Sequence, residues 1–268
     1  MTIPVEVVAV GHVTCDITCP LEGWPERDTK TILPAIELCG GGPAANAAAT
    51  LSRLGINTGL VGRLGDDLLG HYSFQDHEQA GLDVSHLVID QRALSPVSVI
   101  LSDLGEGTRT ILLTKGKHTT LDVEDLDWEW LKGARVIHLD GHQMRASLAI
   151  AAKAQQWPNT ITTLDAGSMR EGMVELAELC DIVICSHRFA REFTGSNDPW
   201  ECISQIKQHG AKQVGVTLGS SGCCFFRRVI SMKYLHLTLL CVIRLGREMH
   251  FTEDSFLRGI SVFLLRSV

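Results

Sequence analysis

A glycine-rich run at residues 40–46 constrains the chain more than any other feature. It reads Gly-Gly-Gly-Pro-Ala-Ala-Asn and leads into a helical pattern that ends at Gly55. Glycines let a ligand approach the main chain closely, and Pro43 suits the first position of a helix. Asn46 is the single amide in an alanine-rich segment. We interpret the run as the floor of a small-molecule site; a plain glycine loop with a solvent-facing Asn46 is the alternative.

Short apolar runs alternate with helical patterns along most of the chain. This alternation is typical of β-α-β units, and it predicts a doubly wound, mostly parallel α/β sheet with helices on both faces. We expect strands at residues 5–10, 58–61, 136–139, 160–164, 181–185 and 213–217, and helices at residues 44–54, 66–80, 146–155 and 199–209.

Two β-rich runs, residues 97–102 and 108–113, break this alternation. They are separated by Gly105-Glu106-Gly107, which favours a hairpin over another β-α-β unit. Together with residues 29–38, they predict a small β lid. The expected organisation is therefore one core at residues 1–226, with a lid from about 12–40 and 95–115.

Composition excludes several classes of protein. The net charge of -7 argues against a general nucleic-acid surface. Nine cysteines without zinc-like spacing favour a reducing compartment over a disulfide framework. The first ten residues do not resemble a secretory signal, and no apolar segment has the length of a membrane span. We expect a cytoplasmic protein without nucleic-acid or membrane partners.

Polar residues follow several of the predicted strands. Ligands collect at the carboxyl ends of parallel strands in doubly wound sheets, so these residues predict a site there. Capping of the next helix is the alternative for each one taken singly. His138 and His142 flank one of them, but two histidines without a third ligand do not predict zinc. The residues are Asp16, Asp140, Asp165, Ser186 and Thr217.

A Thr-x-Gly-x-x-Gly element follows the predicted strand at 213–217. Thr217 offers a hydroxyl, while Gly219, Ser220 and Gly222 offer flexible backbone donors of the kind that face phosphates. A hairpin turn is the alternative. No Walker-type lysine motif occurs in the chain.

The glycine run and this Thr-x-Gly-x-x-Gly element, together with their spacing, resemble the ribokinase-like (PfkB) carbohydrate kinase family over residues 5–226. The resemblance implies an ATP-dependent kinase that transfers a phosphoryl group to a sugar hydroxyl, with Mg²⁺ as the expected metal. Ser186-His187-Arg188-Phe189 stands where many members have Asn-x-x-Glu. A nucleoside kinase, or a sugar- or nucleotide-binding protein without turnover, is the alternative.

The resemblance also implies roles for individual residues. Asp28 is expected to contact sugar or belong to the lid, with a solvated loop charge as the alternative. Arg109 can reach an anionic phosphate with its planar fork, or be an exposed edge-strand charge. A homodimer through the lid is a further expectation. The implied sugar-binding residues are Asp16, Asp28, Gly41, Gly42, Asn46, Arg109 and Asp140, and the nucleotide-binding residues are Ser186, Thr217, Gly219, Ser220 and Gly222.

Residues 227–268 depart from the family pattern. They contain no alanine, proline, asparagine, glutamine or tryptophan, and seven Lys/Arg minus three Asp/Glu gives them a charge of +4. The expected Asp-Thr-x-Gly-Ala-Gly-Asp motif, whose last Asp is the family's catalytic base, is absent. We therefore expect an aberrant tail and no catalytic base in this chain.

A shift of reading frame explains the tail. Joining the third base of each codon to the first two of the next, from Val242 to Glu248, permits Asp-Thr-Thr-Gly-Ala-Gly-Asp. Met249 then forces Ala, which the family also expects there. The hypothesis is that the frame is left between about Gly222 and Lys233, which would make this product inactive or unstable; splicing is the alternative origin.

Overall fold

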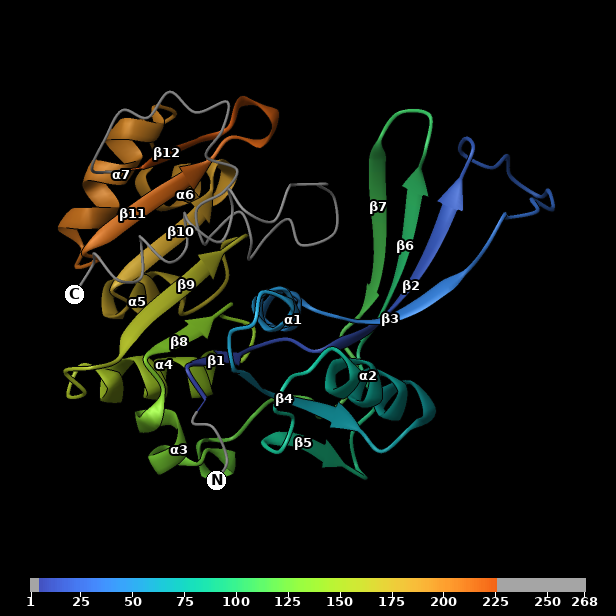
Figure 1. Ribbon diagram of the computed structural model, residues 1–268. Helices are drawn as coiled ribbons and strands as arrows, with labels where there is room; N and C mark the ends of the chain where they lie inside the picture. The colour runs from blue at the N-terminus through green and yellow to red at the C-terminus, as the bar shows by residue number, and fades with distance from the viewer. Residues whose placement is uncertain (1–4, 226–268) are drawn as a thin grey trace.

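The computed structural model describes residues 5–225, in which a large sheet forms the centre of the molecule (Figure 1). Its strands are β1 (Val7–Val10), β4 (Thr58–Gly65), β5 (Leu87–Asp90), β8 (Val136–Leu139), β9 (Ile161–Ala166), β10 (Ile182–Ser186), β11 (Gln213–Thr217) and β12 (Cys223–Phe225). They lie in the order β12-β11-β10-β9-β8-β1-β4-β5. All neighbours are parallel except β11 and β12, which are antiparallel.

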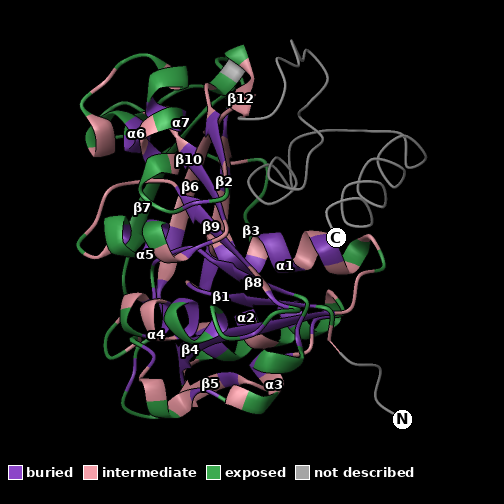
Figure 2. Cartoon of the chain, turned by 90° about the vertical axis from the view of Figure 1, so that its left-hand side faces the viewer, coloured by how far each residue is buried: buried purple, intermediate pink, exposed green. Residues whose placement is uncertain are grey.

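Helices cover both faces of this sheet because successive strand residues point to opposite sides. Val7 and Ala9 face α1 (Pro43–Arg53) and α2 (Leu68–Gln79), whereas Val8 and Val10 belong to the larger core on the other face. Buried residues concentrate in the strands between the two helix layers (Figure 2). The helices of the second face are α3 (Trp128–Gly133), α4 (Met144–Ala154), α5 (Met173–Leu179), α6 (His187–Thr194) and α7 (Pro199–Gln208).

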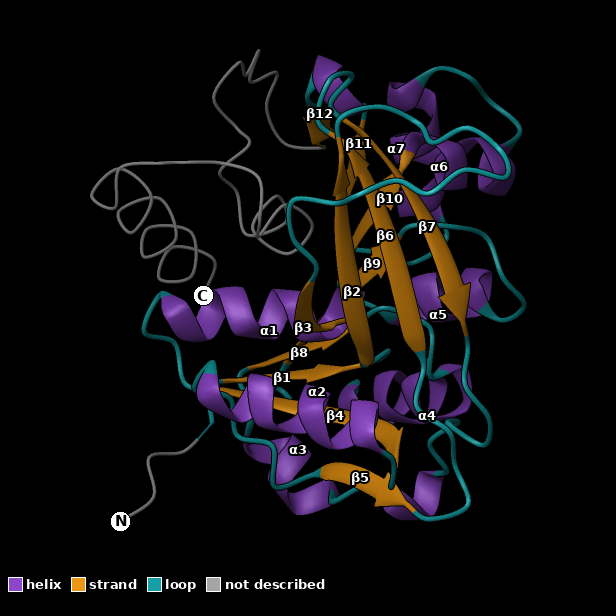
Figure 3. Cartoon of the chain, turned by 90° about the vertical axis from the view of Figure 1, so that its right-hand side faces the viewer, coloured by secondary structure: helices purple, strands orange, loops and turns teal. Residues whose placement is uncertain are grey.

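A second sheet of four strands projects beyond α1 and α2 (Figure 3). Its order is β3-β2-β6-β7, and β2 and β6 are parallel while the other pairs are antiparallel. Every residue of β7 is exposed, so this sheet is an open layer. We refer to these four strands as the lid: β2 (Thr14–Leu21), β3 (Glu37–Gly41), β6 (Val97–Asp103) and β7 (Thr108–Thr114).

The predicted α/β fold with a mostly parallel sheet is confirmed, but several elements differ. Residues 29–38, expected to belong to the lid, enter its sheet only from Glu37, where β3 begins, and the residues before it are mostly exposed. Strand β2 was not predicted, since Thr14–Leu21 includes Asp16 and Pro20, which have low strand propensity. Its pairing with both β3 and β6 overrides that preference.

Three further expectations from the sequence concern the tail, the cysteines and membrane spans. Residues 227–268, which we expect to form an aberrant tail, lie outside the described residues. None of the cysteines within residues 5–225 forms a disulfide. In the same stretch of chain, no helix combines the length and apolar character that crossing a membrane requires.

Candidate active site

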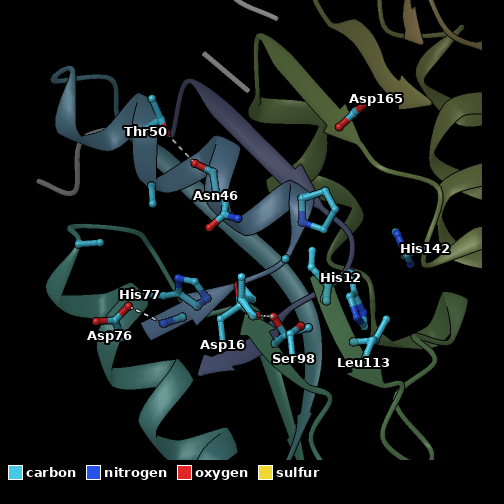
Figure 4. A pocket seen from close by; sticks show the side chains of 18 of the residues that line it. His12, Asp16, Asn46, Thr50, Asp76, His77, Ser98, Leu113, His142 and Asp165 are labelled. Atoms are coloured by element: carbon cyan, nitrogen blue, oxygen red, sulfur yellow. Dashed lines mark hydrogen bonds between the residues drawn. The ribbon is translucent and has the colours of Figure 1, made fainter. Parts of the chain in front are cut away.

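A cavity of about 380 Å³ lies between α1 and the lid (Figure 4). Its α1 wall is one helical face, because the residues there are spaced three or four apart. Its lid wall is one face of the β6–β7 ladder, on which paired residues such as Ile100 and Ile111 stand side by side. The α1 wall is formed by Pro43, Asn46, Ala49, Thr50 and Arg53, and the lid wall by Ser98, Ile100, Arg109, Ile111 and Leu113.

The glycine run makes the turn from β3 into α1. Gly42 has a φ of 105°, and a Cβ there would lie 2.0 Å from the carbonyl oxygen of His12, so only glycine fits. Pro43 then occupies the first turn of α1. This turn brings the Asn46 side chain into the cavity (Figure 4).

Asp16 lies opposite this turn, on β2. Its side chain is buried, and its Oδ1 accepts a hydrogen bond from the Thr14 hydroxyl at 2.6 Å. A Cβ on Gly41 would lie 2.1 Å from its Oδ2, so Asp16 packs directly over the Gly41 backbone. The Asp16 carboxylate and the Asn46 amide thus line the same cavity. This arrangement is required if both groups are to bind hydroxyls of one sugar, as the sequence predicts.

Helix α2 contributes two residues that sequence reasoning missed. Asp76 Oδ2 accepts a hydrogen bond from the Gly40 backbone N–H at 2.6 Å, and a Cβ on Gly40 would lie 2.5 Å from the His77 ring. Both side chains line the cavity beside Asp16 (Figure 4). The only available signal was Gly40, the first glycine of the run, whose close neighbours cannot be read from sequence.

Asp140 follows β8 and is almost fully buried. Its Oδ2 accepts hydrogen bonds from the backbone N–H groups of His12 at 2.8 Å and Ala44 at 3.2 Å, and its Oδ1 from that of His142 at 2.9 Å. A Cβ on Gly11 would lie 2.3 Å from this carboxylate. Asp140 is not among the residues that line the cavity; it ties three backbone segments together beneath it.

Two imidazoles line the end of the cavity away from Asp76. The rings of His12 and His142 are stacked, with centroids 4.8 Å apart and planes 16° apart. Burial lowers the pKa of His12, and partial desolvation lowers that of the more exposed His142, although Asp140 opposes both shifts. Both rings are therefore neutral near pH 7, when each carries one N–H donor and one acceptor nitrogen.

The remaining predicted sugar-binding residues lie in two places. Arg109 lines the cavity from β7. Asp28 lies on an exposed loop with a φ of 57° and is not among the lining residues. Asp165, at the end of β9, does line the cavity.

The predicted nucleotide residues lie outside the cavity, at the carboxyl ends of β10 and β11. Ser186 caps α6 by accepting a hydrogen bond from the Phe189 N–H at 3.0 Å, and it donates to the Gly167 carbonyl. The Thr217 hydroxyl donates to the Cys185 carbonyl at 3.3 Å. Gly219 and Gly222 have positive φ, as a backbone nest requires. Ser220 lies between them in the same short helical turn.

The chain is similar to known sugar and nucleoside kinases. The model of the pfkB family carbohydrate kinases matches residues 5–237. An ATP-dependent ribose-1-phosphate kinase of Halopiger xanaduensis is 31% identical over 158 residues, 59% of this chain and 53% of that protein. A nucleoside kinase of Methanothermobacter thermautotrophicus is 28% identical over 134 residues, 50% of this chain and 43% of that protein. The chain thus spans about half the length of these two relatives.

A solved structure agrees on the fold. Arabidopsis thaliana ribokinase complexed with ribose and ATP superposes with a TM-score of 0.72 at 20% identity, covering 96% of this chain and 90% of that one. At this identity the likeness shows the shared architecture alone.

Proposed function

Because this chain belongs to the pfkB family of carbohydrate kinases, we propose that its cavity is the acceptor site of an ATP-dependent sugar kinase. One observation carries the proposal: Asp16 and Asn46, from separate elements, line one cavity above a glycine floor. A carboxylate that accepts two hydrogen bonds and an amide that both donates and accepts suit adjacent sugar hydroxyls. Gly42 lines the cavity with Gly40 and completes the floor, while Gly41 lies beneath the Asp16 side chain and is not among the lining residues.

The apolar part of the lid wall covers the sugar in this proposal. Ile100, Ile111 and Leu113 face α1 across the cavity. Excluding water there strengthens the hydrogen bonds that Asp16 and Asn46 make to the acceptor. A nucleoside is the second candidate acceptor, since the same apolar wall can pack against a base; the nucleoside kinase among the relatives supports keeping it.

We place the nucleotide at the carboxyl ends of β10 and β11. Ser186, Thr217, Gly219, Ser220 and Gly222 gather there, at the edge where open α/β sheets bind ligands. Within residues 5–225 no three His, Cys, Asp or Glu side chains form a group that could hold a metal ion. Mg²⁺ commonly binds through phosphates and few protein ligands, so in this proposal it enters with ATP and neutralises charge on its phosphates.

The catalytic step depends on a segment that this chain lacks. The printed sequence contains no Asp-Thr-x-Gly-Ala-Gly-Asp motif, and the residues in its place lie outside the described part of the chain. Phosphoryl transfer uses a carboxylate that accepts the proton of the acceptor hydroxyl. We therefore propose that this product binds sugar and turns it over slowly or not at all, while the restored frame encodes the full kinase.

Partner and location are also proposals. Leu112 of β7 is an exposed apolar residue on the face of the lid opposite the cavity-lining Ile111 and Leu113, which supports a homodimer through the lid. Cysteines without disulfides in residues 5–225 accord with the expected cytoplasmic location.

Two measurements test the proposed function. Calorimetry of the protein with the present sequence should show saturable binding of at least one of ribose, fructose and adenosine. If none of the three compounds binds, the acceptor site is refuted. ADP release should be at background for the printed chain and should appear in a version whose tail reads Asp-Thr-Thr-Gly-Ala-Gly-Asp. Equal turnover by both versions would refute the assignment of the missing base.

A further inference from the structure

Asp76 on α2 faces the acceptor cavity, and the sugar site proposed above does not use it. Its carboxylate is half-buried and lines the cavity from the side of α2 (Figure 4). The Oδ2 atom accepts a hydrogen bond from the backbone N–H of Gly40 at 2.6 Å. No residue between 5 and 225 forms a hydrogen bond or an ion pair with Oδ1. One oxygen of Asp76 is therefore fixed by the glycine run, while the other is available to a ligand.

Helix α2 is tied to the base of the lid around Asp76. The Ser73 hydroxyl donates to the Thr14 carbonyl of β2 at 2.8 Å, and the Tyr72 hydroxyl donates to the Leu38 carbonyl of β3 at 2.9 Å. The bond from Gly40 to Asp76 is the third such tie. A side chain on a helix that is held in this way keeps its unbound oxygen in a defined position, which discrimination between similar ligands requires.

The glycine run places Asp76 close to Asp16. Asp16 packs over the backbone of Gly41, and Asp76 binds the N–H of Gly40, so the two carboxylates lie against consecutive residues. Asn46 lines the same cavity from α1. The cavity thus offers three hydroxyl-binding side chains, which come from β2, α1 and α2.

The available oxygen of Asp76 requires a donor from the ligand. A carboxylate oxygen only accepts hydrogen bonds, and a bond from a hydroxyl to a charged acceptor is stronger than one between neutral groups. In a sugar the donors are its hydroxyls. A hydroxyl that reaches Oδ1 is therefore recognised in addition to those on Asp16 and Asn46.

The supply of hydroxyls separates the two candidate acceptors. In the proposed function, Asp16 and Asn46 hold adjacent hydroxyls, and a further hydroxyl receives the phosphoryl group. The ribose of a nucleoside has lost its anomeric hydroxyl to the base, so these roles use all the hydroxyls that it has. A free pentose or hexose keeps at least one more, which can bind Asp76.

We propose that Asp76 is a specificity-determining residue of the acceptor site, whose Oδ1 accepts a hydrogen bond from a hydroxyl that free sugars have and nucleosides lack. The inference rests on the proposed function for the presence of an acceptor in the cavity, and it adds the class of that acceptor. Asp16 and Asn46 recognise the hydroxyl pair that both classes share. Asp76 makes the site prefer the free sugar.

Calorimetry of the variant Asp76→Asn tests this assignment. Asparagine keeps an oxygen for the Gly40 N–H but presents an uncharged NH₂ group in place of Oδ1. Affinity for ribose or fructose, whichever the parent chain binds more tightly, should fall by about tenfold. Affinity for adenosine should stay at its parent value. Equal losses for the sugar and adenosine, or no loss for the sugar, would overturn the assignment.

Deoxy sugars then test the contact itself. In the parent chain, three deoxy forms of the bound sugar should bind about tenfold more weakly, because each lacks the hydroxyl of one of the three side chains. One of these forms should bind Asp76→Asn and the parent chain equally, since its missing hydroxyl is the partner of Asp76. If the loss from the variant adds to the loss from every deoxy form, Asp76 does not bind a hydroxyl and the inference fails.

Tyr72→Phe is the matched control for an indirect effect. It removes a neighbouring tie between α2 and β3, and Tyr72 is not among the residues that line the cavity. This variant should bind every ligand like the parent chain. A loss of sugar affinity as large as that in Asp76→Asn would assign the effect to a loosened α2 and overturn the inference.

Two further outcomes are distinguishable. If near-ultraviolet circular dichroism shows that Asp76→Asn has lost its packing, the deoxy series on the parent chain decides: weaker binding for three deoxy forms supports Asp76, and weaker binding for only two overturns it. If the parent chain binds neither sugar, the proposed function fails and this inference fails with it. Sugar binding that Asp76→Asn leaves unchanged overturns the inference alone.

Discussion

Asp16 on β2 leans over the backbone of Gly41 on β3, so closely that a Cβ on Gly41 would lie 2.1 Å from its Oδ2. The two residues are diagonal neighbours in the strand ladder, in which Thr14 pairs with Gly41 and Asp16 with Cys39. The strand pairing therefore places the Asp16 carboxylate over residue 41, and the missing Cβ of Gly41 leaves the space that the carboxylate occupies. Glycine at position 41 is a condition for Asp16 to reach the cavity.

Gly41→Ala is expected to displace the Asp16 carboxylate. The new methyl group overlaps it, and such overpacking costs roughly 1–3 kcal/mol of folding free energy. Affinity for the acceptor sugar should fall by about tenfold or more because Asp16 no longer faces its hydroxyl. Calorimetry and urea unfolding measure the two effects.

The matched control is Gly133→Ala at the end of α3. A Cβ there meets no atom within 4 Å. Helix propensity predicts a gain of about 0.5–1 kcal/mol and unchanged sugar binding. A Gly41→Ala protein that binds sugar like the parent would show that the contact with Asp16 is irrelevant to the site.

Asn46→Ala should weaken sugar binding without destabilising the fold. Alanine is the better helix former at this position of α1, so the midpoint of urea unfolding should stay constant or rise. Loss of the amide should weaken sugar binding by about tenfold, the value of one hydrogen bond. Asn159→Ala, in the exposed turn before β9, is the control. Equal affinity in the two variants would exclude Asn46 from the acceptor site.

Asp140→Asn should act mainly on stability. An asparagine retains one acceptor oxygen, but its NH₂ group cannot accept the backbone hydrogen bonds that the second carboxylate oxygen receives. Leaving a buried N–H unsatisfied costs about 1–3 kcal/mol of unfolding free energy. Asp28→Asn, on an exposed loop whose positive φ asparagine tolerates, should cost almost nothing. If Asp140→Asn instead weakens sugar binding at unchanged stability, Asp140 is a direct ligand.

His138 should make the protein sensitive to acid. Burial lowers its pKa from 6.5 to about 4, while its Nδ1 lies 2.9 Å from the Thr163 hydroxyl. Below pH 6.5 the unfolded chain binds a proton that the folded chain refuses, so the free energy of unfolding declines as pH falls from 6.5 towards about 4. Below that window both states are protonated and this contribution stops changing.

The variant His138→Gln tests this origin of acid sensitivity. Glutamine does not titrate, so urea unfolding of the variant should show a flatter pH dependence across the same window. A parent-like slope in His138→Gln would assign the acid sensitivity to other groups.

Periodicity and turn chemistry predicted the sheet and its flanking helices well. Strand β11 has its predicted bounds of Gln213–Thr217, and α1 begins at Pro43 as the glycine run indicated. These elements are predictable because a buried parallel strand is a short continuous apolar run, and because proline and glycine mark helix ends.

The missed parts depend on long-range contacts. Strand β2 contains polar residues and gains its conformation from pairing with β3 and β6. The stacked rings of His12 and His142 come from segments that no local pattern connects. Asp140 was predicted to face sugar because it follows a strand; the backbone donors that surround it come from two loops and a helix start, and only the folded chain brings them together.

The strand order places β1 between β4 and β8, so that Val7 pairs with Thr58 on one side and with Val136 on the other. Because Val136 comes much later in the sequence, β8 is synthesised long after β1. On the ribosome, β1 and β4 can pair early, but one apolar edge of β1 stays open until β8 emerges. Such an edge is a template for pairing between nascent chains. The central position of β1 therefore affects the yield of folded protein. That yield depends in part on how fast the chain between β4 and β8 is translated, and on whether chaperones cover the open edge during that interval.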